Sequence, residues 1–259
     1  NYIFKEKYII DLVGRRDGSS RFGPENRFAS FGSISSAWIF SHESFITRNI
    51  RFLSFGKLRA SYGTSGNDQI GDYGYLDTYS TTSVTYQSIT PLVPTRLANP
   101  NYSWETNSKL EGGLELGILQ DRISLNISYY TNRSSNQLIG QQVSGVTGFS
   151  TVQANLAATV ENTGLELEVN SQNLKRGDFL WSTSFNLTIP RNKLVEFKNL
   201  ESSAYANRFV IGQSINIDKV YSFQGVNAQT GVYQFLDIDG SNSISSPLDN
   251  QTIINPGPT

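Results

Sequence analysis

The sequence predicts an all-β fold that forms part of a large antiparallel transmembrane β-barrel with long extracellular loops. Three observations lead to this prediction. Apolar and polar residues alternate strictly along several segments, these segments are long for strands of a soluble sheet, and their connections are short at one end and long at the other. Because successive side chains on a strand point to opposite faces, each segment has one apolar and one polar face.

The composition suits strands and turns better than helices. Charged residues make up 17% of the 259 residues, aromatic residues make up 12%, and there are 22 glycines. A soluble globular protein carries about 25% charged residues. The net charge of −1 gives no reason to expect nucleic acid as a partner. The absence of cysteine excludes disulfides, thiolate metal sites and a cysteine nucleophile.

Four segments show the alternation most clearly, namely 110–118, 123–129, 165–170 and 181–189. In the second, Ile123, Leu125 and Ile127 alternate with serine and asparagine. With the turn residues between segments, the pattern predicts strands near 7–16, 27–40, 56–64, 103–118, 121–133, 157–171 and 178–190, and weaker ones near 207–213 and 219–236. Several have the roughly 9–11 residues that a tilted membrane strand needs.

The connections between the predicted strands differ in length. Residues 119–122 fit a tight hairpin, whereas 65–102 and 134–156 are long and rich in Gly, Ser and Thr or Gln. Short turns at one end and long loops at the other are typical of outer-membrane barrels. Aromatic residues near strand ends fit an interfacial girdle, namely Phe22, Phe28, Trp38, Phe40, Trp104, Tyr129, Tyr130, Phe179 and Trp181.

Several longer motifs resemble those of one family. Residues 15–23 read RRDGSSRFG and residues 57–73 read KLRASYGTSGNDQIGDY. Shorter motifs follow in order, namely NPNYSWET at 99–106, GVTGF at 145–149, NTGLE at 162–166 and FLWSTSFN at 179–186. Together they cover nearly the whole chain and resemble the SusC/RagA-type TonB-dependent outer-membrane transporters.

The resemblance implies that residues 1–259 are a portion of a longer protein's barrel. Family members have a signal peptide, a TonB-contacting segment and a plug domain before a closed barrel of about 22 strands. No such N-terminal parts are recognisable here, Met is absent even at position 1, and residues 255–259 resemble a turn before further strands. We therefore expect a fragment without plug or signal peptide and without the C-terminal strands.

The same resemblance implies a function without covalent chemistry, so an enzyme is not expected. Such transporters sit in the bacterial outer membrane and import oligosaccharides or peptides, using energy delivered through the TonB complex. A SusD-like surface lipoprotein is the implied partner at the extracellular loops, and outer-membrane lipid is expected around the apolar face. Substrate identity is not readable from the sequence.

Aromatic residues in the first long loop form the candidate ligand site. Tyr73, Tyr75, Tyr79 and Tyr86 lie among serines and threonines. Aromatic faces beside hydroxyl groups suit sugar rings or peptide side chains, but tyrosines also anchor long loops against their neighbours. Both roles stay open at this point.

A second candidate site is a degenerate calcium loop at 237–248. Asp237, Asp239 and Ser241 occupy the first, third and fifth positions of an EF-hand-like pattern. The twelfth position is Leu248 instead of a bidentate acid, and Asp249 comes one residue late. A possible Ca²⁺ ion is the expectation, with an ion-free Asp/Gly/Asn turn as the alternative.

Two other classes of protein compete with a transporter. A soluble β-sandwich module for glycans would pack its apolar faces against each other, and it would stay monodisperse without detergent. A secreted glycosidase would need a carboxylate pair in a cleft, for which Glu111 with Glu115 or Glu166 with Glu168 are the available pairs. The single histidine, His42, has no sequence context for a catalytic triad and is expected at a turn or rim.

Overall fold

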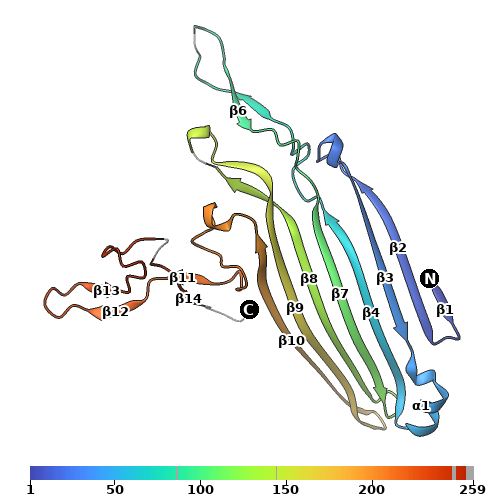
Figure 1. Cartoon of the computed structure of the whole chain (residues 1–259). Helices are drawn as coiled ribbons and strands as arrows, with labels where there is room; N and C mark the ends of the chain where they lie inside the picture. Colours follow the sequence, from blue (N-terminus) through green and yellow to red (C-terminus); the bar gives the residue numbers. More distant parts are fainter. Residues whose placement is uncertain (86, 144, 247–248, 255–259) are drawn as a thin grey trace. The chain divides into compact units, whose positions relative to one another are not determined.

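The computed structural model describes residues 1–85, 87–143, 145–246 and 249–254. One sheet of eight strands dominates it, in the order β1-β2-β3-β4-β7-β8-β9-β10 (Figure 1). These strands are β1 (Tyr2–Phe4), β2 (Tyr8–Gly18), β3 (Phe28–Trp38), β4 (Leu53–Asn67), β7 (Glu105–Ile118), β8 (Ile123–Gln142), β9 (Thr151–Arg176) and β10 (Phe179–Phe197). Each strand lies beside its neighbour in sequence, except that a separate hairpin intervenes between β4 and β7.

The remaining elements are short. The hairpin between β4 and β7 consists of β5 (Thr78–Thr81) and β6 (Leu92–Arg96). The other strands and helices are β11 (Asp218–Val220), β12 (Phe223–Val226), β13 (Tyr233–Phe235), β14 (Thr252–Ile254), η1 (Pro24–Asn26), η2 (Phe40–His42), α1 (Ser44–Asn49), η3 (Gly145–Thr147) and η4 (Leu200–Ser202). Among the described residues, no helix has both the length and the apolar character that crossing a membrane requires.

The all-β prediction and the seven main strands are confirmed, but several boundaries differ. β8 and β9 extend well beyond the predicted 121–133 and 157–171, because their polar ends continue to pair past the alternating apolar part. The weak strand at 207–213 is wrong, since these residues form turns. The single weak strand at 219–236 corresponds to the short strands β11, β12 and β13.

The strand register confirms that alternation sorts residues between two faces. Leu58 of β4 lies opposite Leu114 of β7, which lies opposite Ile127 of β8. Lys57, the residue before Leu58, lies opposite Glu115, the residue after Leu114. The apolar positions therefore continue from strand to strand on one face, and the charged positions continue on the other.

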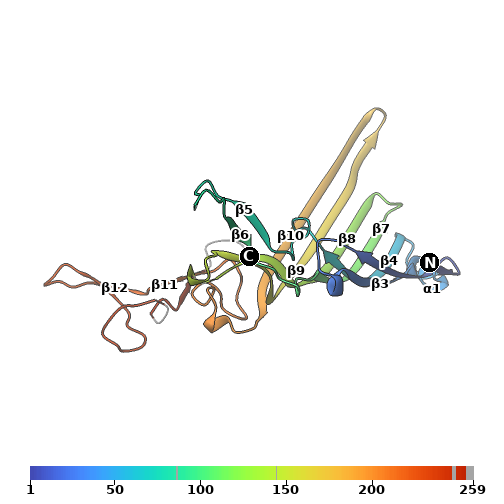
Figure 2. The same cartoon turned by 90° about the horizontal axis from the view of Figure 1, so that it is seen from above.

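Two compact units divide the chain. The first comprises residues 1–156 and 162–190 and contains the main part of the sheet, and Figure 2 shows it from above. The second comprises residues 157–161 and 191–259. Its described part pairs β11 with β14 and β12 with β13 and buries a small core of Val160, Leu194, Phe197, Leu200 and Ile217.

Connections in the first unit lie at two ends of the sheet. The turns at 5–7, 119–122 and 177–178 are short and lie at one end, together with the segment of α1 (Figure 1). Leu119, Gln120 and Asp121 all have left-handed φ angles, as a tight hairpin requires. The opposite end carries the connections 19–27, 68–104 and 143–150.

Candidate functional site

The apolar face of the sheet is exposed. Large side chains on it include Leu12 of β2, Leu58 of β4, Leu110 of β7 and Tyr129 of β8, which are each at least about half exposed. No second layer packs on this face among the residues that the structure describes. An exposed apolar surface of this extent marks contact with something other than water. The paired apolar faces expected of a soluble sandwich are therefore not found in the described part of the chain.

The opposite face carries a network of ion pairs between β4 and β7. Lys57 Nζ lies 3.3 Å from Glu115 Oε1, and Arg59 Nε lies 3.1 Å from the same oxygen. Arg59 also bonds Glu111, whose second oxygen lies 2.9 Å from Lys109 Nζ. Both carboxylates of the first candidate glycosidase pair, Glu111 and Glu115, are thus ion-paired with basic side chains.

An open groove of about 430 Å³ lies on this charged face near the short turns. It is lined by residues from four strands and one turn, including the polar side chains of Glu115, Asp121, Asn126, Glu168 and Asn170. Asn170 Nδ2 donates to Glu168 at 2.9 Å, and the Ser54 hydroxyl donates to Asp121 at 2.8 Å. The polar face predicted for Glu111, Glu115, Glu166 and Glu168 therefore carries ion pairs and hydrogen bonds.

Three of the sequence motifs meet in a small aromatic core at the long-loop end, where Gly66 of the motif 57–73 lies beside rings of the motif 99–106 and of β3. Phe22 and Tyr102 are fully buried, and their ring centroids are 5.8 Å apart. Trp104 lies 5.4 Å from Phe22 and 5.8 Å from Phe31. The girdle prediction is wrong for Phe22, because this ring packs inside the protein. It is also wrong for Tyr130, which lies opposite Glu111 on the charged face and packs its ring over Gly164.

Polar bonds connect the same motifs around the aromatic core. Arg21 donates to Asp72 at 3.1 Å and to the carbonyl of Asp68 at 2.9 Å. Asn155 accepts from the backbone N–H of Ser103 at 2.9 Å and donates to its carbonyl at 2.8 Å. These bonds therefore link the start of the long loop 68–104 to residue Arg21 of the first motif, and the end of the loop to strand β9.

The candidate tyrosines divide into two structural roles. Tyr75 is half-buried against Gly23, and its carbonyl accepts from Asn99 N–H at 2.9 Å, so it anchors the loop. Tyr73 and Tyr79 are exposed by 54% and 58%. A hydrogen bond to Asp77 raises the pKa of Tyr79. Tyr86 lies outside the described residues.

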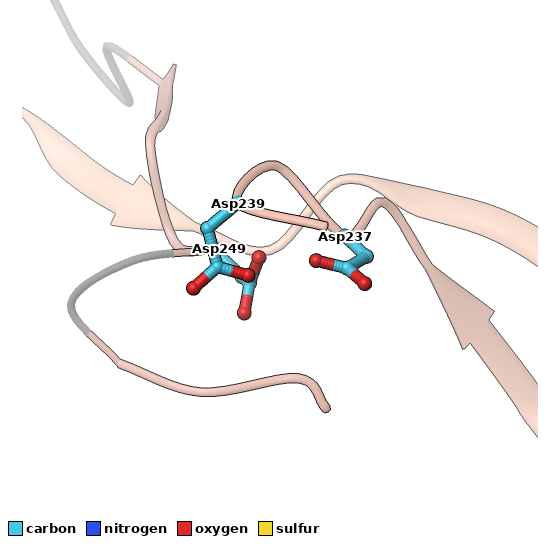
Figure 3. A group of neighbouring side chains, drawn as sticks. All are labelled: Asp237, Asp239 and Asp249. Carbon is cyan, nitrogen blue, oxygen red and sulfur yellow. The ribbon is translucent and has the colours of Figure 1, made fainter. Parts of the chain in front are cut away.

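Acidic residues do gather in the second unit, in a different combination from the predicted one. Ligand oxygens of Asp237, Asp239 and Asp249 lie within 4.8 Å of one another (Figure 3). The predicted donor Ser241 donates its hydroxyl to the carbonyl of Ser243 instead. Asp249 comes one position after the twelfth residue of the EF-hand pattern. The sequence could have indicated it as a ligand if this late position had been interpreted as a one-residue insertion. Leu248 lies outside the described residues.

Backbone N–H groups already satisfy these carboxylates. Asp237 accepts from Gly240 at 2.8 Å and from Asn242 at 2.7 Å. The buried Asp249 accepts from Ile238 at 2.8 Å and from Ser245 at 2.7 Å. A hydrogen bond from the backbone of Ser241 lowers the pKa of Asp239. The donor set fits a calcium ion by its chemistry, but the loop conformation is also accounted for by these bonds.

Glu43 organises the opposite, short-turn end. Its carboxylate lies 3.0 Å from Lys7 Nζ and accepts from the Tyr8 hydroxyl at 2.8 Å and from Trp38 Nε1 at 3.3 Å. The Lys7 bond, followed by the Tyr8 bond, lowers the pKa of Glu43. His42 lies in η2 and contacts the carbonyl of Glu6 at 3.2 Å. This turn position agrees with the role expected for His42.

Known proteins resemble the chain over almost all its length. A family profile described as "TonB dependent receptor-like, beta-barrel" matches residues 1–232. TonB-dependent receptor P39 of Formosa agariphila is 30% identical over 94% of this chain and 22% of its own length. TonB-dependent receptor SusC of Bacteroides thetaiotaomicron is 29% identical over 79% of this chain and 21% of its own length.

A solved structure described as the RagAB peptide transporter has the same fold. It superposes with a TM-score of 0.81 at 26% identity, covering 97% of this chain and 28% of that one. The chain therefore spans only about a quarter of the length of the relatives it matches. These relatives are named as receptors and a transporter, not as enzymes.

Proposed function

Because this chain belongs to the TonB-dependent receptor β-barrel family of outer-membrane proteins, we propose that it is a piece of barrel wall in an energised importer of oligosaccharides or peptides. The observation that supports this most is the single sheet with one exposed apolar face and one charged face. A wall between lipid and a water-filled lumen needs these two faces. The paired carboxylates on the charged face act as lumen lining in this proposal.

The proposed activity needs parts beyond these 259 residues. We propose that the wall works with a plug domain and further barrel strands of a longer protein, with a TonB complex, and with a SusD-like surface lipoprotein. The relatives' greater length supports the first of these. A sheet left open in lipid would have unpaired backbone groups at β1 and β10, which also favours additional strands.

The exposed tyrosines are the proposed ligand contacts. Tyr73 and Tyr79 present their rings at the long-loop end, whereas Tyr75 serves as the anchor of the same loop. The relatives indicate the substrate class only broadly. One matched protein is described as a peptide transporter. Calcium at Asp237, Asp239 and Asp249 remains a prediction, because the acidic cluster by itself establishes no cofactor.

Uptake by cells tests this proposal. Deleting the full-length gene should abolish uptake of one labelled pool, either oligosaccharides or peptides, and the intact gene should restore it. Restoration with Tyr73→Ala and Tyr79→Ala together should leave the protein in the outer membrane but reduce uptake at low substrate concentration. Unchanged uptake of both pools after deletion would rule out the import function, and unchanged uptake in the double variant would assign these tyrosines to loop structure alone.

A further inference from the structure

The connection between β3 and β4 is long for its end of the sheet. It comprises residues 39–52, here called the rim segment, and contains η2 and α1 (Figure 1). The other turns at this end, at 5–7, 119–122 and 177–178, are short, and hairpin loops usually have about two to five residues. In outer-membrane barrels the short turns lie on the periplasmic side of the membrane. The rim segment is therefore an addition at the periplasmic edge of the barrel wall.

The rim segment is bonded to the apolar face of the sheet. The register places Trp38 opposite both Tyr8 and Leu58, so the three side chains lie on this face. Glu43, the residue directly before α1, accepts from the Tyr8 hydroxyl at 2.8 Å and from Trp38 Nε1 at 3.3 Å. Helix α1 therefore begins beside the apolar face and not beside the charged face.

Aromatic rings continue the apolar face into the rim segment. Phe40 of η2 packs its ring over Gly56, which belongs to the apolar face because it lies opposite Leu116. The ring centroids of Phe40 and Trp38 are 5.8 Å apart. Tryptophan and tyrosine are enriched where lipid headgroups meet the acyl chains, since one end of the side chain is apolar and the other is polar. Trp38 and Tyr8 therefore place the rim segment at the level of the headgroups.

The exposed side chains of the rim segment are either aromatic or basic at four positions. Phe45 and Phe52 are exposed by 56% and 59%, and Arg48 and Arg51 are also exposed. Phe45 and Arg48 lie three residues apart on one face of α1. Within the part of the chain that the structure describes, neither guanidinium has an ion pair or a hydrogen bond. Residues 44–52 contain no acidic side chain that could neutralise the two arginines.

We infer that the rim segment binds anionic phospholipid of the periplasmic leaflet. Arg48 and Arg51 contact the headgroup phosphate, and Phe45 and Phe52 lie among the acyl chains. Lipid is the occupant because the segment continues the exposed apolar face, which in an outer-membrane protein meets lipid. A guanidinium binds phosphate through two parallel hydrogen bonds, and two uncompensated positive charges favour a headgroup with net negative charge.

This inference goes beyond the proposed function, because it uses the place of the family in the outer membrane and no step of import. It also assigns a role to the one connection whose length sets it apart from the other turns at its end of the sheet. Exposed phenylalanine beside arginine is the composition with which interfacial helices bind anionic membranes. The arginine stems can extend along the acyl chains while their charged ends stay among the headgroups.

A fluorophore on α1 measures the lipid composition next to the rim segment. The 259 residues contain no cysteine, so Ser44→Cys provides the attachment point in full-length protein that has no other cysteine. Ser44 is exposed, so the label displaces no buried contact. The protein is placed in phosphatidylcholine bilayers that contain a small fraction of phosphatidylglycerol or phosphatidylcholine with a nitroxide quencher on its acyl chain. The two quenching curves give the local preference for the anionic headgroup.

We expect labelled phosphatidylglycerol to associate about 30-fold more strongly than labelled phosphatidylcholine, because each basic residue at an anionic membrane surface strengthens binding by roughly five-fold. Arg48→Gln combined with Arg51→Gln should bring this ratio close to one and leave quenching by labelled phosphatidylcholine unchanged. Arg48→Lys combined with Arg51→Lys is the matched control. It keeps both charges and should keep most of the preference.

Three results would overturn the inference. Equal quenching of the wild-type protein by both lipids would mean contact with lipid but no recognition of the headgroup. No quenching by either lipid would mean that water or another protein surrounds α1. A preference that survives the two glutamine substitutions would assign it to other cations. Equal amounts of the three proteins in the outer membrane, with equal resistance to protease, exclude misfolding as the cause of a lost preference.

Discussion

Glycines on the sheet act as recesses for large neighbouring side chains. A Cβ atom added at Gly113 would lie 2.7 Å from Arg59 Nε, and one added at Gly164 would lie 2.5 Å from the Tyr130 hydroxyl. Gly56 accommodates the ring of Phe40 in the same way. None of these glycines has a positive φ angle. Glycine is therefore needed at these positions because a side chain would collide with its neighbour, and not because of the backbone conformation. The sequence could not predict this use, because it depends on which residues the register brings opposite one another.

Gly113 and Gly112 make a matched pair for testing this role. Gly113→Val should push the Arg59 guanidinium away from Glu111 and Glu115 and lower the free energy of unfolding by about 1–2 kcal/mol. Gly112 points to the apolar face and has nothing within 4 Å of an added Cβ, so Gly112→Val should be neutral or slightly stabilising. Urea unfolding of the full-length protein in detergent checks both; equal effects would contradict the recess.

Glu43 predicts a pH dependence at the short-turn end. Its pKa is lower in the folded protein than the ordinary 4.5, so its contribution to stability is fully present above that value and is lost as the pH falls through the folded pKa. Thermal unfolding should show Glu43→Gln less stable than wild type at pH 7, with the difference shrinking as the pH falls from 4.5 through the lowered pKa of Glu43.

The bond from Lys7 is the first cause of this shift, which provides a control. Lys7→Met should remove most of the pH-dependent difference in stability that Glu43→Gln causes. The double variant should lose no more stability than the two single variants lose together. A difference between Glu43→Gln and wild type that is still unchanged at the pH where the wild-type Glu43 carboxyl is seen to be protonated would show that the glutamate stabilises the turn without its charge.

At the scale of elements, period-two alternation predicted the strands and, between two of them, the tight turn at 119–122. It did so because each strand residue lies on one of only two faces of the sheet. It failed where other interactions decide the conformation. Phe209 stacks on Tyr205 at a centroid distance of 5.9 Å, so the apolar run at 207–213 packs as turns and not as a strand. The hairpin β5–β6 was missed inside a loop whose polar composition hides it.

The acidic loop of the second unit carries the prediction on metal binding. We expect calcium to bind weakly, with a dissociation constant of about 10⁻⁴–10⁻³ M, because backbone N–H groups already occupy the carboxylates and the bidentate acid is missing. Calorimetry of the full-length protein should detect this heat, and Asp239→Asn should abolish it. No heat at millimolar calcium would mean that the loop needs no ion.

At the scale of the whole molecule, the sequence left one question that alternation alone cannot answer. An apolar strand face reads the same whether it meets a core or lipid. The motifs favoured lipid through their resemblance to a family, and the uncovered face from Leu12 to Tyr129 agrees. The candidate site was less predictable. Tyr75 and Tyr79 differ only in their long-range contacts, and the lumen ion pairs depend on a register that one sequence does not give.

The strictly sequential strand order has a consequence for how this sheet assembles. Each strand can join the one made just before it, so most steps close only a short loop. The step from β4 to β7 is different. Its connection of residues 68–104 is about three doublings longer than the turn at 119–122, which adds roughly 2 kcal/mol of closure entropy. Tyr102 and Trp104 lie just before β7 and pack on Phe22, which lies in the connection 19–27 between β2 and β3. The aromatic core can thus capture the returning chain and place it in register, so its loss should slow this step more than any other.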